Sequence, residues 1–97
     1  MQKILIIEDN PTISENIALY LEAKNHHTAI ASDGEKVFDM IRTGKYDFLI
    51  IDRMIPKIDG LSLVRMMQAR DIVIPFLFLT ALGKQVDQRF FLSFRFL

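Results

Sequence analysis

The sequence predicts an α/β fold in which a doubly wound parallel sheet carries helices on both faces. Three short apolar runs, at residues 4–7, 48–51 and 76–79, predict the inner strands, because unbroken apolar runs are typical of strands that are covered on both faces. Segments with helical spacing of apolar residues separate these runs. Such alternation implies parallel strands that are joined by right-handed crossovers.

The remaining elements are weaker in pattern. Residues 28–31 predict a fourth strand near an edge of the sheet. Residues from about 11 to 21 predict the first helix, whose start is open: Asn10 can cap it with Pro11 in the first turn, while Thr12 and Glu15 have capping-box spacing. Two further helices are expected at about 34–42, between Asp33 as cap and Gly44 as stop, and at about 61–69.

Composition excludes several classes of protein. The 97 residues indicate one domain, and 12 basic against 12 acidic residues argue against a dedicated nucleic-acid module. The absence of cysteine excludes disulfides and thiolate metal sites. No apolar segment is long enough for a signal peptide or a membrane helix. We therefore expect a soluble, cytoplasmic protein.

Oxygen-bearing side chains follow the apolar runs. Glu8 and Asp9 come after the first run, Asp52 after the second and Thr80 after the third. Ligands of open α/β sheets bind beyond the carboxyl ends of the strands, so these groups should share one edge. Clustered carboxylates repel one another unless a cation compensates, and Mg²⁺ prefers such oxygen ligands together with a phosphate. With no glycine-rich phosphate loop, the phosphate could be covalent on an aspartate.

Each acid taken alone has a simpler explanation. Asp9 by itself would more often cap a helix than bind a metal, and Asp52 could simply end a strand. The joint pattern at three strand ends is what favours a functional site.

The chain resembles the receiver domain of two-component response regulators. The resemblance rests on residues 3–9, on 52–56 with Asp59-Gly60, and on 75–81, with 31–34 in support. It covers about residues 2–84 and implies a flavodoxin-like sheet with strand order 2-1-3-4. We therefore divide the chain into a partial receiver domain, residues 1–84, and an atypical apolar tail, residues 85–97.

The resemblance also implies residue roles. Asp52 would be the phosphoacceptor, receiving a phosphoryl group from a sensor histidine kinase, and Thr80 would be the switch hydroxyl. Mg²⁺ would be bound by Asp9, Glu8, Asp52 and the backbone carbonyl of Met54. Such a domain accepts phosphate by self-catalysed transfer and is not a turnover enzyme.

The C-terminal part departs from the family pattern. Residues 82–89 resemble the start of a fourth helix, but the family's regular fifth βα unit and its Lys-Pro pair are absent. For the apolar tail a strand, a helical extension and disorder all stay open. We expect a truncated or frame-shifted regulator with impaired output, and the alternative is a natural short paralogue. We also expect the 76–79 strand to be an exposed edge that promotes self-association.

Two rival functions remain open. One is a docking module that binds a kinase or a sister regulator without phosphorylation. The other, which we rank last because no substrate pocket or general acid is evident, is a metal-dependent phosphatase-like hydrolase using Asp52.

Overall fold

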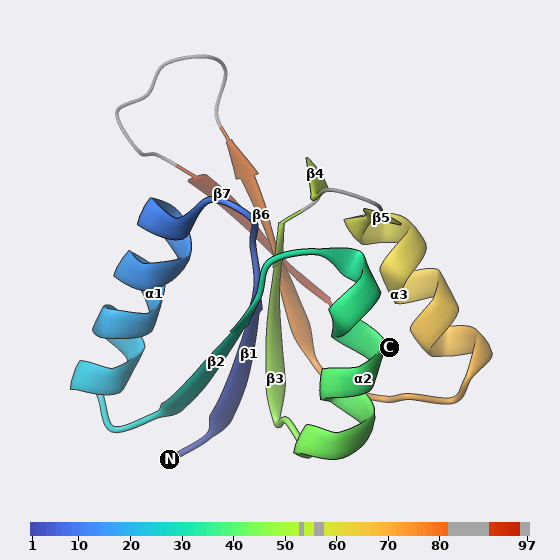
Figure 1. The fold of residues 1–97 in the computed structure, drawn as a ribbon, viewed down its shortest axis with the longest axis horizontal. Coiled ribbons are helices and arrows are strands. Elements are labelled where there is room, and N and C mark those ends of the chain that lie inside the picture. Colours follow the sequence, from blue (N-terminus) through green and yellow to red (C-terminus); the bar gives the residue numbers. More distant parts are fainter. Residues whose placement is uncertain (53, 56–57, 82–89, 96–97) are drawn as a thin grey trace.

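The computed structural model describes residues 1–52, 54–55, 58–81 and 90–95. Strands and helices alternate along most of the chain, as the sequence predicts (Figure 1). In order, the elements are β1 (Lys3–Ile7), α1 (Pro11–Ala23), β2 (His27–Ala31), α2 (Gly34–Gly44), β3 (Phe48–Asp52), β4 (Met54–Ile55), β5 (Ile58–Asp59), α3 (Gly60–Ala69), β6 (Phe76–Ala81) and β7 (Phe90–Arg95).

The main sheet has the strand order β2-β1-β3-β6-β7. Its first four strands are parallel, which confirms the predicted order 2-1-3-4 and the place of β2 at an edge. The registers pair Ile7 with both Ala31 and Ile51, so β1 and β2 end at the same level and β3 ends one residue later, at Asp52. This alignment places Glu8, the residue that follows β1, beside Asp52.

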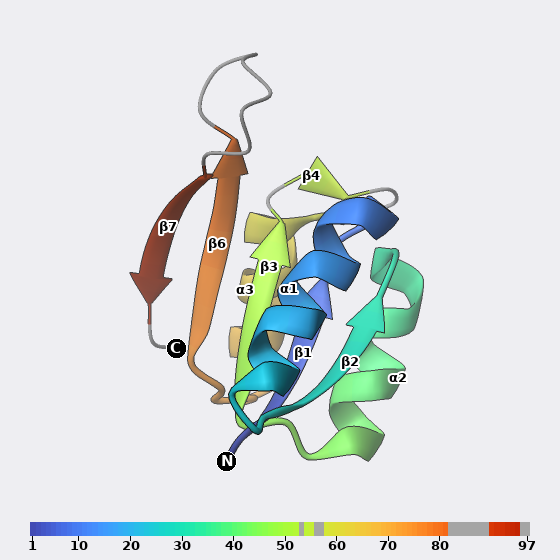
Figure 2. The same cartoon turned by 90° about the vertical axis from the view of Figure 1, so that its left-hand side faces the viewer.

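Alternation along β1 divides the core between the two faces of the sheet. Ile4 and Ile6 pack with α1, whereas Leu5 and Ile7 pack with α2 and α3. Among the described residues, the face with α2 and α3 holds twelve buried core residues and the α1 face five. Figure 2 shows α1 on one face of the sheet, with α2 and α3 on the other.

Polar caps fix where the helices begin. The Asn10 side chain accepts hydrogen bonds from the backbone N–H groups at the start of α1, at 2.9 and 3.3 Å. This confirms Asn10, and not the alternative start at Thr12, as the cap. Asp33 caps α2 in the same way, as predicted, and Asp59 caps α3. The predicted helix bounds are therefore correct to within one or two residues.

Residues 90–95 of the tail form a strand, one of the three conformations that the sequence leaves open. β7 pairs antiparallel with β6 over the whole length of both strands, from Phe76 opposite Arg95 to Ala81 opposite Phe90. The expectation that the 76–79 strand is an exposed edge is therefore wrong. Eight residues separate β6 from β7 in the sequence, fewer than the dozen or more that a parallel crossover needs, whereas antiparallel strands can be joined by a short connection.

The predicted start of a fourth helix, at 82–89, lies outside the described residues. None of the helices in the described part of the chain has the length and apolar content needed to span a lipid bilayer.

Candidate functional site

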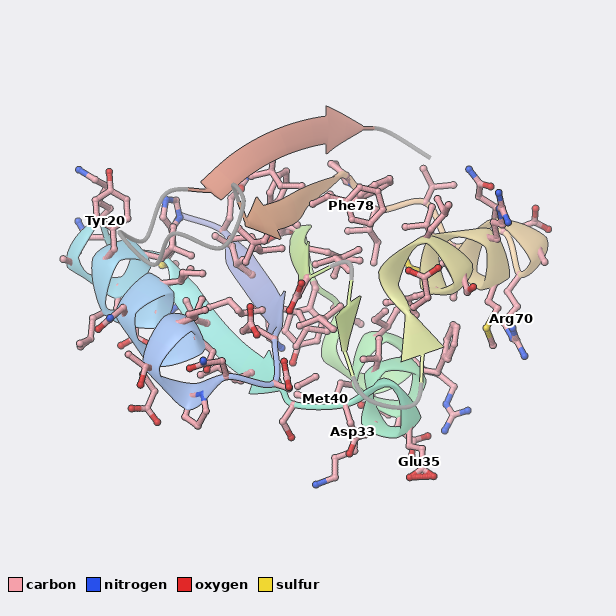
Figure 3. The ribbon with its side chains drawn as sticks, turned by 90° about the horizontal axis from the view of Figure 1, so that it is seen from above. Tyr20, Asp33, Glu35, Met40, Arg70 and Phe78 are labelled. Carbon is pink, nitrogen blue, oxygen red and sulfur yellow. The ribbon has the colours of Figure 1, made fainter. Side chains whose placement is uncertain are left out.

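Three carboxylates meet where β1 and β3 end. Glu8 and Asp9 follow β1, and Asp52 is the last residue of β3. Because Ile7 and Ile51 are register partners in adjacent strands, the residues after them are neighbours. One carboxylate oxygen from each of Glu8, Asp9 and Asp52 lies within 4.8 Å of the other two. Figure 3 looks down on this end of the sheet.

The three side chains differ in exposure. Glu8 is buried, with 3% of its surface exposed, Asp52 is half-buried and Asp9 is exposed. The backbone N–H of Glu8 donates to the carbonyl of Ala31 at 3.0 Å, and its carboxylate accepts from the backbone N–H of Asn10 at 3.0 Å. Glu8 is therefore fixed at both its backbone and its side chain.

The environment of Glu8 makes its ionisation unfavourable. Burial raises the pKa of the Glu8 carboxyl from its ordinary value of 4.5 to about 7, and the hydrogen bond from Asn10 acts in the opposite direction. The negative charge of Asp52 and the hydrogen bonds with the Asp9 and Asp52 side chains are smaller contributions to the same rise. The fold thus places a carboxyl in a position where its charge needs compensation.

A hard divalent cation fits this donor set. Mg²⁺ takes oxygen ligands, usually a small number of carboxylates together with waters or phosphate oxygens. The cluster combines a buried, a half-buried and an exposed carboxylate, so a cation bound there would contact both protein and solvent. Binding would also compensate the charge that burial makes unfavourable on Glu8.

Two other predicted site residues lie on neighbouring elements. Leu79 of β6 is the register partner of Asp52, so Thr80 is one residue further along the adjacent strand. The Thr80 side chain lies outside the described part of the structure. Met54, the predicted carbonyl ligand, opens β4 two residues after Asp52.

Sequence reasoning missed what holds Glu8 in place. It identified Asn10 as a helix cap but not as the donor to the Glu8 carboxylate, and it gave Ala31 no role at the site. The sequence did contain a signal for the burial of Glu8. Glu8 directly follows a run of four apolar residues, all of them buried in the structure, which indicates a carboxyl at the end of an inner strand.

Comparison with known proteins decides the family. The sequence of residues 4–95 matches the family model of the response regulator receiver domain. The chain belongs to this receiver domain family. The assignment agrees with the parallel strand order and with the place of the acidic cluster.

Curated relatives of this receiver domain are longer proteins. The chain is 34% identical to the transcriptional regulatory protein DltR of Streptococcus agalactiae over 86 residues. This alignment covers 89% of the chain and 38% of DltR. The chain is 31% identical over 87 residues to the alkaline phosphatase synthesis transcriptional regulatory protein PhoP of Bacillus subtilis, covering 90% of this chain and 36% of PhoP. The chain thus spans little more than a third of the length of these relatives.

Solved receiver domains share the fold. The receiver domain of the Francisella response regulator 1452 superposes with a TM-score of 0.81 at 32% identity, over 88% of this chain and 70% of that one.

Proposed function

We propose that this receiver domain accepts a phosphoryl group on Asp52 from the phosphohistidine of a sensor kinase, with Mg²⁺ as cofactor. The observation that carries the proposal is the meeting of Glu8, Asp9 and Asp52 within 4.8 Å at one end of the sheet. Membership of the receiver family supports it. The proposed reaction is a single transfer onto the protein itself and not a turnover reaction.

Each residue of the site has a role that follows from its position. Glu8 and Asp9 would hold Mg²⁺ together with Asp52 and the backbone carbonyl of Met54. When bound, Mg²⁺ neutralises negative charge on the carboxylates and on the phosphoryl oxygens. The hydrogen bond from Asn10 keeps the Glu8 carboxylate directed into the cluster. Asp52, which is half-buried, keeps contact with solvent and so with an incoming phosphoryl donor.

The transfer itself is a displacement at phosphorus. A carboxylate oxygen of Asp52 forms the new P–O bond while the P–N bond of the phosphohistidine breaks. The imidazole nitrogen keeps the electron pair of the broken bond, and a proton from solvent restores the neutral ring. The product is an acyl phosphate on Asp52.

Signal output requires more than the acceptor carboxylate, and we propose that it is weakened here. Thr80 would be the switch hydroxyl. The strand next to it, β7, pairs Phe91 with Thr80 and contains no lysine that could contact the phosphoryl group together with Thr80. We also propose cytoplasmic action, within a pathway that regulates transcription, because curated relatives are transcriptional regulators.

Intact mass spectrometry tests the phosphoacceptor role. The protein is incubated with acetyl phosphate and MgCl₂, and we expect the added mass of one phosphoryl group, lost on treatment with hydroxylamine. Asp52→Asn should abolish the adduct. Asp71→Asn is the matched control, because Asp71 is exposed in the turn after α3, away from the cluster, and has a left-handed backbone that Asn tolerates.

The controls separate this function from its rival. Removal of Mg²⁺ with EDTA should also prevent the adduct. A folded chain that stays unmodified with Mg²⁺ and acetyl phosphate, and again with a phosphorylated kinase, would contradict the proposal. That result would favour the docking module.

A further inference from the structure

We propose that β7 pairs edge to edge with β7 of a second copy of this chain, forming a two-fold symmetric dimer centred on Ser93. The two sheets would then join into one continuous sheet through an antiparallel β7–β7 contact. The proposal concerns the surface opposite the β2 edge and is independent of the phosphoryl chemistry at Asp52.

One edge of β7 is open in the structure. β7 is the last strand in the order β2-β1-β3-β6-β7, so within the described residues it pairs with β6 alone. Figure 2 shows β7 at the outer side of β6, with its other edge facing away from the sheet. An open edge presents unpaired N–H and C=O groups that favour pairing with another strand.

The composition of β7 does not protect this edge. Natural edge strands are usually blunted by proline, by lysine or other charges, or by short length. β7 has six residues, Phe-Phe-Leu-Ser-Phe-Arg, with no proline and a single charge at Arg95. Aromatic residues and few charges are typical of segments that add to a neighbouring strand.

Symmetry identifies a second copy as the occupant. Two identical strands can pair antiparallel about a two-fold axis perpendicular to the sheet, and one residue then lies opposite its own copy. With Ser93 at that position, Leu92 is opposite Phe94 of the second copy and Phe91 is opposite Arg95. All residues from 91 to 95 are then paired.

This register also agrees with the charges. The two Arg95 residues lie four positions apart along the joined strands, or roughly 13 Å at 3.3 Å per residue. That distance exceeds the Debye length of about 8 Å at physiological salt, so their repulsion is screened. The chain has no net charge, so copies do not repel each other over longer distances.

Paired charge variants at Ser93 give the sharpest test. Sedimentation velocity on the full chain, up to about 100 µM, should show a concentration-dependent dimer, because a small interface of this kind gives weak affinity. Ser93→Lys and Ser93→Glu each place like charges directly opposite, and each should weaken dimerisation by up to about fivefold. An equimolar mixture of the two variants should restore the dimer.

A matched control variant separates this edge from general charge effects. Ser32→Lys makes the same change at an exposed residue beyond β2, the opposite edge of the sheet, and should leave dimerisation unchanged. Far-ultraviolet circular dichroism checks that each variant is folded.

A second measurement covers the case in which the charged variants do not fold. The chain contains no cysteine, so Ser93→Cys introduces a single thiol. Mild oxidation with oxidised glutathione should convert this variant to a disulfide-linked dimer, whereas Ser32→Cys should remain monomeric. Three results would overturn the proposal. One is a wild-type protein that stays monomeric at about 100 µM. The others are dimerisation of Ser93→Lys and Ser93→Glu as strong as that of the wild type, and an equimolar mixture of these two variants that does not form the dimer.

Discussion

Replacing Glu8 by glutamine is expected to remove most of the pH dependence of stability in the metal-free protein between pH 5 and pH 8. The folded chain holds the Glu8 carboxyl at a pKa of about 7, because the group is buried beside Asp9 and Asp52. In the unfolded chain the same carboxyl is exposed to water and its pKa has the ordinary value of 4.5. The two states therefore bind different numbers of protons over this range.

The sign follows from the direction of the shift. Below pH 4.5 both states are protonated, and Glu8 does not affect the free energy of unfolding. As the pH rises towards 7, the unfolded chain loses its proton while the folded chain keeps it, so the folded state becomes progressively less stable. Above that pH both states are ionised, and the full cost of the buried charge is present.

The size can be worked from the same shift. One pKa unit corresponds to about 1.4 kcal/mol. The metal-free wild-type protein should therefore lose about 2 to 3 kcal/mol between pH 5 and pH 8 relative to Glu8→Gln. The amide side chain of the variant keeps an oxygen that can accept from the Asn10 N–H, so the substitution changes the charge and preserves the hydrogen bond.

Urea unfolding in EDTA, followed by circular dichroism at several pH values, measures the effect. Comparison with the variant cancels the contributions of all other groups, because the two proteins differ at residue 8 alone. Addition of Mg²⁺ at pH 8 should then stabilise the wild-type protein more than the variant, since binding to the folded state adds to stability. Parallel stability curves for the two proteins, together with equal stabilisation by Mg²⁺, would refute the reasoning.

Three further predictions concern the scaffold. Asp33→Ala should cost about 1 kcal/mol in the free energy of unfolding, measured by urea titration, because two N–H groups of α2 lose their cap. Leu63→Ala should cost about 2 to 5 kcal/mol at a fully buried site, whereas Leu19→Ala, at a side chain 66% exposed, should change stability by less than about 0.5 kcal/mol. Gly44→Ala should destabilise the fold by about 1 kcal/mol, since its Cβ would overlap the Tyr46 ring; in a Tyr46→Ala background the same change should be neutral or stabilising.

The parts of the fold that follow from periodicity were predictable. The apolar runs at 4–7, 48–51 and 76–79 are inner strands because a strand that is covered on both faces needs apolar residues on both. Asn10 and Asp33 cap helices because their side chains satisfy N–H groups that the helix leaves free. Such signals are local, so a single sequence contains them.

The short elements were not predictable in the same way. The hairpin of β4 and β5 has strands of two residues, too short for any alternation to be seen. The direction of β7 depends on its pairing with β6, a contact between distant residues. The short spacing between β6 and β7 excludes a parallel crossover but allows antiparallel pairing, which the expectation of an exposed 76–79 edge did not consider. The error about the 76–79 edge comes from this omission.

At the candidate site, sequence reasoning located the carboxylates but not their energetics. Strand ends that share a level bring Glu8, Asp9 and Asp52 together, as expected for a parallel sheet. How deeply Glu8 is buried depends on the tertiary packing of the fold, and so does the rise in its pKa. Such a property needs three-dimensional contacts that no motif encodes.

The central place of β1 has a consequence for how the chain is made. β1 is translated before both of its neighbours, which are His27–Ala31 on one side and Phe48–Asp52 on the other. At roughly 5 to 20 residues per second, several seconds pass before the second neighbour has been translated. During that interval one of the most apolar segments of the nascent polypeptide has no completed sheet to join, and chaperones that bind extended apolar peptides would find their target there.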